Sequence, residues 1–469
     1  MSLSPSYDAV VVGAGMSGMA AAIRLAMFDK KVLLVEKHSI PGGLNSFYRR
    51  ANRNLDVGLH ALTNAVPKGT RAAPLTKLLK QLRIPYEALK LSPQTHSLIR
   101  FPKATMRFTN DFNDFDDQIK THFPQSTQGW NELVEAIKSF NETNLENEYE
   151  SAKDKVATFI QDEQLREMIF CPLMIYGSAW EHDMDWSQFV IMFKSIYLEG
   201  LGRPEGGVRT IIKLLTDKLQ ELGVELRYRC ELQEVCTDQG NVKSVRLNDK
   251  RLGEILIETP LVFSSAGLPE TLAKTQGQDS ITARPGSMSF TETILFMHKT
   301  PNQLNQKATL IFHNNRDHYQ YQKPEQLIDD QSAVICLPNN YHEGTSEFNE
   351  GVARVTFMAN NEKWVSLSEE EYKREKEKVT AKAIALVSSY FNDSPEIIYH
   401  DTFTPKTVTR YTGHFAGAVY GSPDKSRDGT TATNGLIITG TDQGFLGIVG
   451  AMLSGISMAN LHGLQGGRL

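Results

Sequence analysis

The feature that most constrains this chain is a cluster of glycines between an apolar strand and an Ala-rich helix near its start. The sequence Gly13-Ala-Gly15-Met-Ser-Gly18 follows a β-branched run at 8–12 and opens a helical segment at 16–27. A second apolar strand is predicted at 31–35, which completes a βαβ unit with a right-handed crossover. In this context Gly13 allows a tight turn, Gly15 lets the backbone approach a pyrophosphate, and Gly18 lets the helix pack closely on the sheet.

An acidic residue ends the second predicted strand. Glu36 lies 18 residues after Gly18, where its carboxylate can accept hydrogen bonds from an adenosine ribose and disfavours a 2′-phosphate. This position favours FAD or NAD over NADP. The glycine pair Gly42-Gly43 and the sequence Asp56-x-Gly58 follow at a spacing typical of flavoproteins. A second glycine turn lets the backbone lie against the diphosphate and ribityl chain of FAD, and NAD has no ribityl chain.

A third glycine-rich block lies near the end of the chain. The apolar strand predicted at 435–439 is followed by Gly440, Asp442 and the glycines Gly447 and Gly450, which open a small-residue helix. We expect the Asp442 carboxylate to bond a ribityl hydroxyl or a water on the pyrophosphate. The N-terminus of the helix would place backbone N–H groups and a positive dipole beneath the N1–C2=O edge of a flavin.

Four blocks of the sequence together resemble a known family. They are residues 10–18 with Glu36, residues 42–60, residues 204–207 with 222–223 and 232–235, and residues 435–455. The chain resembles the FAD-dependent phytoene desaturases, carotenoid isomerases and retinol saturases of the amine-oxidase-like flavoprotein superfamily. The resemblance implies that Leu232 contacts the adenine through its backbone. Phytoene desaturases and amine oxidases usually carry arginine where this chain has Leu44, so the sequence is more similar to the isomerase and saturase branches.

The resemblance and the pattern of predicted elements give an α/β fold class. We expect a Rossmann-like FAD-binding domain of the GR2 type with an interleaved α+β substrate domain and a helical insert. The FAD-binding domain is expected at 1–71, 202–285 and 401–469, the helical insert or substrate cap at 72–201, and the substrate-domain sheet and helix at 286–400. Helical periodicity supports the insert, and strand-like runs at 288–297, 333–337 and 353–358 support the substrate domain.

The predicted cofactor site draws on several segments of the chain. Its residues are Gly13, Ala14, Gly15, Met16, Ser17, Gly18, Glu36, Lys37, Gly42, Gly43, Leu44, Asn45, Gly58, Leu59, His60, Leu232, Ala266, Gly440, Asp442, Gly447, Ile448, Val449 and Gly450. No metal site is expected.

Two residues are candidates for catalysis. His60 lies on a loop expected near the flavin, where it would donate to the substrate or to the reduced ring, and a purely structural histidine is the alternative. Tyr420 would line the same cavity, with a packed aromatic as its alternative. Six apolar residues are candidates for the pocket wall or, by default, for the core of the sheet: Met288, Phe290, Leu295, Phe296, Phe357 and Met358.

These features predict an FAD-dependent oxidoreductase that acts on carbon–carbon double bonds of an apolar polyene or isoprenoid. Desaturation, saturation and redox-neutral isomerisation remain open. A flavin amine oxidase is one alternative, and a non-catalytic isoprenoid-binding escort protein is another. Only one dinucleotide fingerprint is visible, so the electron donor or acceptor is unknown, with a quinone, oxygen or another protein as options.

Composition narrows the partners. The chain has 50 Lys and Arg against 55 Asp and Glu, a net charge of −5, so it lacks the basic field of a nucleic-acid binder. Its four cysteines have neither metal-site spacing nor a secreted disulfide framework, which favours a reducing, cytoplasmic compartment. No targeting leader fits before the first strand, and no apolar run reaches roughly 20 residues, so we expect any membrane contact to be peripheral.

Overall fold

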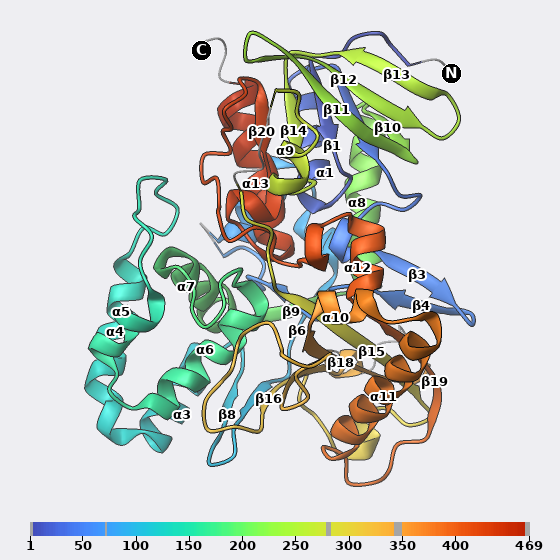
Figure 1. The fold of residues 1–469 in the computed structure, drawn as a ribbon. Coiled ribbons are helices and arrows are strands. Elements are labelled where there is room, and N and C mark those ends of the chain that lie inside the picture. The colour runs from blue at the N-terminus through green and yellow to red at the C-terminus, as the bar shows by residue number, and fades with distance from the viewer. Residues whose placement is uncertain (1–2, 71–72, 278–282, 342–348, 465–469) are drawn as a thin grey trace.

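A five-stranded parallel sheet is built around the first predicted strand. In the computed structural model, which describes residues 3–70, 73–277, 283–341 and 349–464, the strand order is β10-β2-β1-β14-β20 (Figure 1). The strands are β1 (Ala9–Val12), β2 (Val32–Glu36), β10 (Glu225–Tyr228), β14 (Val262–Ser264) and β20 (Leu436–Ile438). The predicted α/β class with a Rossmann-like domain is confirmed, and its sheet assembles from distant parts of the chain.

The two faces of this sheet are covered differently. Helices α1 (Met16–Ala26), α8 (Val208–Glu221) and α13 (Gly447–Met458) cover one face, and a three-stranded antiparallel sheet of β11 (Cys230–Asp238), β12 (Asn241–Asp249) and β13 (Gly253–Glu258) covers the other. The alternation along β1 explains both contacts, because Ala9 and Val11 pack with the helices whereas Val10 and Val12 pack with β11–β13.

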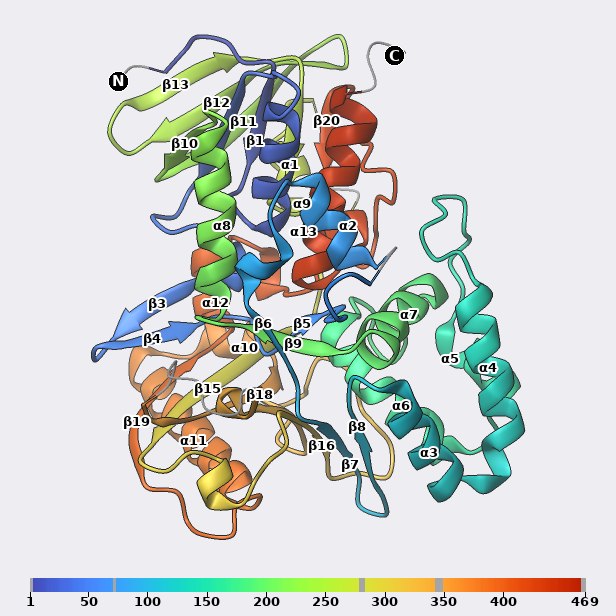
Figure 2. The ribbon, with the colours of Figure 1, turned by 180° about the vertical axis from the view of Figure 1, so that it is seen from behind.

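A seven-stranded sheet forms the second half of the molecule, in the order β19-β15-β18-β17-β16-β7-β8 (Figures 1 and 2). Its strands are β7 (Ser97–Arg100), β8 (Thr105–Phe108), β15 (Ser289–Met297), β16 (Leu310–Asn314), β17 (Ser332–Cys336), β18 (Gly351–Ala359) and β19 (Ile397–Phe403). Helix α11 (Glu369–Ser388) covers one face, where Leu295 and Phe357 meet Val379 and Ala383. Residues of opposite parity, including Phe290 and Glu292, are left for the other face.

Helices at 112–193 stand beside the second sheet, and smaller elements connect the two halves. The helices are α3 (Phe112–His122), α4 (Thr127–Ser139), α5 (Ala152–Phe159), α6 (Glu163–Gly177) and α7 (Trp186–Phe193), which continues as a π-helix at Lys194–Leu198. The connecting elements are β3 (Phe47–Arg50), β4 (Arg53–Asp56), β5 (Leu62–Thr63), α2 (Pro74–Gln81), β6 (Leu91–Pro93), β9 (Leu201–Pro204), α9 (Leu268–Leu272), α10 (Asn361–Ser366) and α12 (Pro405–Thr412).

The expected domain boundaries need correction. The region 72–201 is not a separate helical insert throughout, because β7 pairs in parallel with β16 and so extends the second sheet. Helix α2 buries its leucines in the core that contains α1 and α13. Its apolar periodicity identified an amphipathic helix, but periodicity does not say which neighbour covers the apolar face. Strand β19 begins at Ile397, before the boundary expected at 400/401, and the boundary expected at 71/72 lies outside the described residues.

One stretch of the described residues, Gly447–Leu464, is long and apolar enough by length and composition to cross a membrane. The expectation that no apolar run reaches roughly 20 residues overlooked this stretch of 18 residues. In the structure this stretch is half buried, and α13 within it packs against α1 and α2. Its apolar character is accounted for by this packing in the core.

Candidate active site

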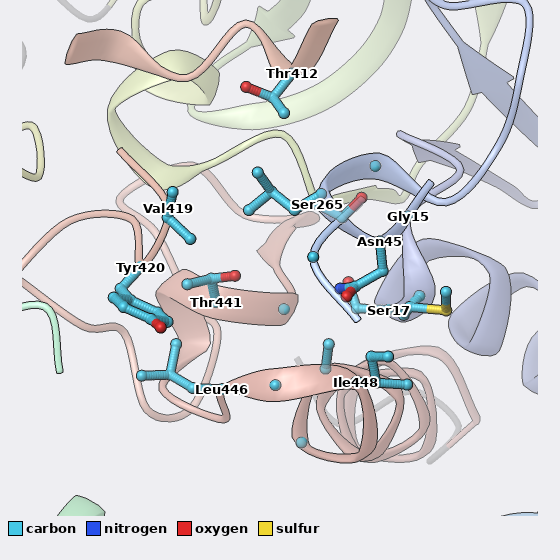
Figure 3. A pocket seen from close by; sticks show the side chains of 18 of the residues that line it. Gly15, Ser17, Asn45, Ser265, Thr412, Val419, Tyr420, Thr441, Leu446 and Ile448 are labelled. Carbon is cyan, nitrogen blue, oxygen red and sulfur yellow. The ribbon is translucent and has the colours of Figure 1, made fainter. Parts of the chain in front are cut away.

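A cavity of about 500 Å³ is lined by residues of both large sheets. The first sheet contributes the carboxyl ends of its parallel strands, including Val12 and Glu36, and the second contributes Phe290, Val334 and Thr356. The carboxyl edge of a parallel sheet is where α/β proteins bind ligands. Figure 3 shows Gly15, Ser17 and Asn45 on one side of this space, with Thr441, Leu446 and Ile448 along another.

Most of the predicted cofactor residues line the cavity. They are Gly13, Gly15, Met16, Ser17, Glu36, Lys37, Gly42, Gly43, Leu44, Asn45, Gly58, His60, Leu232, Ala266, Gly440, Gly447, Ile448, Val449 and Gly450. Ala14, Gly18, Leu59 and Asp442 are not among the lining residues, and each has a different role in the structure.

Two glycine turns face each other at the start of α1. The Gly42 N–H donates to the Ala14 carbonyl at 2.8 Å, and a Cβ on Gly43 would lie 3.4 Å from the Gly15 Cα. Gly15 has an ordinary φ of −74°, and a Cβ added to it would meet no atom of the described residues within 4 Å. Neither strain nor packing within the protein therefore requires glycine at this position. A ligand in close contact with the backbone would require it, as the pyrophosphate of a dinucleotide does.

The N-terminus of α1 is also suited to bind an anion. No side chain in the described part of the structure caps its N-terminus, so its first N–H groups are available to a ligand. Helix α13 begins in the same way: among the described residues no side chain caps it at Leu446, and a Cβ on Gly447 would meet none of their atoms within 4 Å. Both helix starts thus offer uncapped N–H groups beside cavity-lining glycines.

Glu36 is held in place by the backbone around it. One carboxylate oxygen accepts the Ala14 N–H at 2.8 Å, and the other accepts the His38 N–H at 2.8 Å. The residue is 8% exposed and lines the cavity, where its oxygens retain acceptor capacity for ribose hydroxyls. Ala14 therefore braces Glu36 and the second glycine turn through its backbone.

Gly18 and Leu59 support the site from behind. A Cβ on Gly18 would collide with the carbonyl oxygen of Gly13, so Gly18 permits the close packing of α1 that its motif predicts. Leu59 is fully buried, and its carbonyl accepts hydrogen bonds from Arg203 and Arg354. The expectation that Leu59 binds the cofactor is corrected to a structural role.

The prediction for Asp442 is also corrected. Its carboxylate is buried and accepts N–H groups of Leu268 at 2.5 Å and Ser422 at 2.8 Å, with Lys425 Nζ 3.4 Å away. Thr441, the preceding residue, lines the cavity instead (Figure 3). The turn of 3₁₀-helix at Gly440–Gln443 rotates successive side chains to different sides, which the sequence pattern alone does not reveal.

Tyr420 lies on the cavity wall with its hydroxyl already engaged. The hydroxyl donates to the Ile175 carbonyl, and the ring packs edge-on to Phe290 with centroids 5.9 Å apart. Burial raises the pKa of the Tyr420 hydroxyl well above its usual range. These contacts favour the packed-aromatic alternative over proton transfer. Of the six candidate wall residues, Phe290 lines the cavity, whereas Met288, Leu295, Phe296, Phe357 and Met358 belong to cores beside the sheet.

His60 belongs to a buried charged cluster at the cavity wall. Its Nε2 lies 3.3 Å from Glu292 Oε1 and 3.1 Å from Thr356 Oγ1. Glu292 also pairs with Arg354, which is buried and does not line the cavity. Burial alone would raise the pKa of the Glu292 carboxyl, but the charge of Arg354 and the hydrogen bonds from His60 and Arg354 hold this pKa well below its usual range. Burial lowers the pKa of His60, and Glu292 offsets this only in part.

Sequence patterns missed several residues of the site. Glu292 and Thr356 come from strands that read as ordinary sheet core, and only their register across β15 and β18, where they are directly opposite, brings them together. Ser265 follows β14 and donates its hydroxyl to the carbonyls of Val12, at 2.9 Å, and Gly13, at 3.1 Å. Its position at the carboxyl end of a parallel strand was a usable signal.

Comparisons with known proteins agree with this geometry. The family model described as flavin containing amine oxidoreductase matches residues 16–461. The chain belongs to this family. A chloroplastic prolycopene isomerase of Arabidopsis thaliana is 23% identical, over 97% of this chain and 82% of its own. A lycopene-forming phytoene desaturase of Pseudescherichia vulneris is 24% identical, over 58% of each chain. An oxidoreductase structure from Methanosarcina mazei has a TM-score of 0.66 at 16% identity, covering 96% of this chain and 99% of that one.

The cofactor of this flavoprotein is FAD. The open space above Gly15 fits its pyrophosphate, and the backbone-held carboxylate of Glu36 fits its adenosine ribose. The uncapped start of α13, with Ile448 and Val449 on the cavity, fits the polar edge of its ring.

Replacing Gly15 by alanine separates cofactor binding from folding. We expect Gly15→Ala to fold, because its φ suits alanine, and to bind FAD at least about tenfold more weakly, because the methyl group occupies the place of the pyrophosphate. FAD titration of the apoprotein and its thermal unfolding measure the two effects. Gly18→Ala is the matched control, since its methyl group collides with Gly13 and lowers stability instead. Unchanged FAD affinity in Gly15→Ala would contradict the assignment.

The buried ion pair of Glu292 and Arg354, with His60 beside it, makes the stability of the fold depend on pH. Because the pKa values of Glu292 and His60 are lowered in the folded state, the unfolded chain takes up more protons as the pH falls below about 6.5. We therefore expect the unfolding free energy in urea to decrease steadily from pH 7 to pH 4.

The variant Arg354→Met should lower the unfolding free energy by about 3–5 kcal/mol at pH 7, because it leaves the buried carboxylate of Glu292 without its ion-pair partner. The double variant Glu292→Leu with Arg354→Met should recover much of this loss. Arg53→Met, which breaks the partly exposed pair with Glu350, is the matched control and should cost less than about 1 kcal/mol. An Arg354→Met protein as stable as the control would contradict the role of the pair.

Proposed function

We propose that this flavoprotein acts on carbon–carbon double bonds of an apolar polyene or isoprenoid, by desaturation, saturation or redox-neutral isomerisation. The observation that carries the proposal is the apolar part of the cavity wall beyond the two glycine turns at 13–15 and 42–43, which together are called the glycine cradle. It includes Ile175, Tyr176, Met192, Phe290, Val334, Val419, Tyr420 and Leu446. The names of the relatives that align with this chain, prolycopene isomerase and phytoene desaturase, support the same substrate class.

The residues of the wall suit a reaction in which positive charge develops on a hydrocarbon. When bound, FAD supplies the acceptor or donor for a hydride or for electrons. Tyr176 and Phe290 present aromatic surface to the substrate and exclude water from it. Glu292 lines the cavity, and its partner Arg354 does not, so the negative end of the pair lies on the substrate side. This negative end favours a polyene that carries positive charge.

His60 has a positioning role in this proposal. Burial lowers the pKa of its imidazole, which favours the neutral form, and its Nε2 lies within reach of Glu292 and Thr356. It holds the Glu292 carboxylate toward the cavity, and the centroid of its ring lies 6.2 Å from the centroid of the Tyr176 ring. Such an arrangement needs no general acid, which agrees with chemistry carried largely by the cofactor.

A substrate panel tests the function. The FAD-loaded protein is incubated, with and without a chemical reductant, with cis and trans carotenoids and with retinoids, and the products are separated by chromatography. We expect a new isomer, or a change in the number of double bonds, in at least one polyene. Glu292→Gln should lower the rate at least about tenfold, because it removes the charge that favours the cation. Glu350→Gln, a carboxylate paired with Arg53 outside the cavity, is the matched control.

Two outcomes would replace the proposal. Unaltered polyenes together with peroxide release from an amine panel would establish the amine-oxidase alternative. A protein that binds prenylated peptide but takes up no FAD would establish the escort alternative. The electron donor or acceptor follows from the same assay, because reduction of the flavin by NADH or NADPH alone would identify a nicotinamide donor.

We further propose a cytoplasmic protein with peripheral membrane contact through the loop between α4 and α5. Leu145 is 46% exposed and Tyr149 is 50% exposed on this loop, next to a second, smaller cavity of about 70 Å³. We expect part of the protein to float with phospholipid vesicles, and the double variant Leu145→Ser with Tyr149→Ser to float less. Wild-type protein that remains entirely in the soluble fraction would refute this contact.

A further inference from the structure

One end of the main cavity is polar although most of its wall is apolar. The polar lining comes from β5 and from the π-helix after α7, which Figure 2 shows close together, and from the chain that follows α4. Its residues are Thr63, Asn64, Glu142, Lys194, Ser195 and Glu199. The glycine cradle and the Glu292 cluster use none of them. π-Helices are rare and frequently occur at functional sites.

Asn64 is fixed in an unusual conformation at the centre of this group. It has a φ of +61° and is 5% exposed. Its side-chain amide donates to Glu199 Oε2 at 2.9 Å and to Ser195 Oγ at 3.2 Å, and its Oδ1 accepts the Thr63 hydroxyl at 2.9 Å. Its backbone N–H donates to the Ser195 carbonyl at 3.1 Å. These bonds offset the cost of the left-handed backbone and orient the π-helix toward the cavity.

The charges of the group leave one acceptor for a ligand. Lys194 Nζ pairs with Glu142 Oε2 at 2.7 Å and donates to the Phe140 carbonyl at 3.0 Å. Glu199 Oε2 is held by Asn64, whereas its Oε1 accepts no hydrogen bond from the described residues. Burial raises the pKa of Glu199, and the hydrogen bond from Asn64 only partly offsets this.

We propose that this polar end binds a hydroxyl group at the terminus of the polyene substrate. The inference rests on the proposed function and narrows its substrate class to hydroxylated polyenes. A hydroxyl can donate to Glu199 Oε1 and accept from the remaining N–H of Lys194. A hydrocarbon end would strip water from these groups without replacing its hydrogen bonds, which is unfavourable. A carboxylate end would meet two carboxylates and only one ammonium group.

Four probes with one polyene chain and different ends test this proposal: retinol, retinylamine, retinoic acid and the hydrocarbon axerophtene. Binding to the FAD-loaded protein is measured by the quenching of protein fluorescence and by the change in the flavin spectrum. We expect retinol to bind about tenfold more tightly than each of the other three. Equal affinity for retinol and axerophtene, or tighter binding of retinylamine or retinoic acid, would overturn the proposal.

Two variants locate the effect. Asn64→Gly removes the side chain and suits the φ of +61°, so it should fold and lose the preference for retinol. Asn305→Gly is the matched control, because Asn305 has a φ of +62°, is exposed and does not line the cavity. Glu199→Leu should bind axerophtene at least as well as retinol. A retained preference for retinol in both Asn64→Gly and Glu199→Leu would overturn the assignment to this subsite.

The failure of this inference is distinguishable from the failure of the proposed function. If the protein does not act on polyenes, the product assay of the proposed function shows no altered polyene, whatever the affinities of the four probes. If only the hydroxyl subsite is wrong, the probes bind without the expected preference. If the polar end contacts the flavin instead, Asn64→Gly weakens FAD binding and affects all four probes equally, which also overturns the proposal.

Discussion

The carbonyl of Leu59 is the point on which the geometry of the site depends. It accepts hydrogen bonds from Arg354, on the second sheet, and from Arg203, on β9. Each arginine is also paired with a buried carboxylate, Glu292 or Asp56. The loop that carries Gly58 and His60 is thereby tied to the second sheet on one side and to the start of α8 on the other, where Asp56 also accepts the Val208 N–H at 3.3 Å.

This arrangement explains why charged residues are buried next to an apolar cavity. Two isolated ion pairs would gain little over well-packed apolar residues. Sharing one carbonyl acceptor makes the two pairs a connected unit, and removing any member leaves a buried charge or a buried donor without its partner. The unit therefore fixes the distance between the glycine loops and the wall formed by β15, β17 and β18. A site that exchanges a hydride needs that distance to be well defined.

The parts of the site that were predictable from sequence are those in which the local backbone position itself requires a particular residue type. Gly15 and Gly447 keep open space beside a helix start, and Glu36 ends a strand, so spacing along the chain was enough to find them. Asp442 was misjudged because a short 3₁₀ turn decides which side chain faces the cavity. Glu292 and Arg354 were missed because their partnership comes from strands β15 and β18, paired through long-range register. The same limit applies to β7, whose parallel partner β16 lies about 200 residues away.

The cavity carries two kinds of polar group, and their difference bears on selectivity. Near the glycine loops, Glu292 is compensated by Arg354 and His60, so its hydrogen-bonding capacity is largely used within the protein. At the other end, one Glu199 oxygen accepts no hydrogen bond from the described residues, while Asn64 holds the other oxygen in place. A compensated group acts on a ligand mainly through its field, whereas a group with spare capacity acts through a hydrogen bond of defined direction. Under the proposed function, the first arrangement tolerates any polyene in the middle of the cavity, and the second distinguishes one chain end from another. Because the polar end selects one chain end and the middle of the cavity accepts the rest of the chain, a long, flexible substrate would be held with one defined position next to the reacting centre.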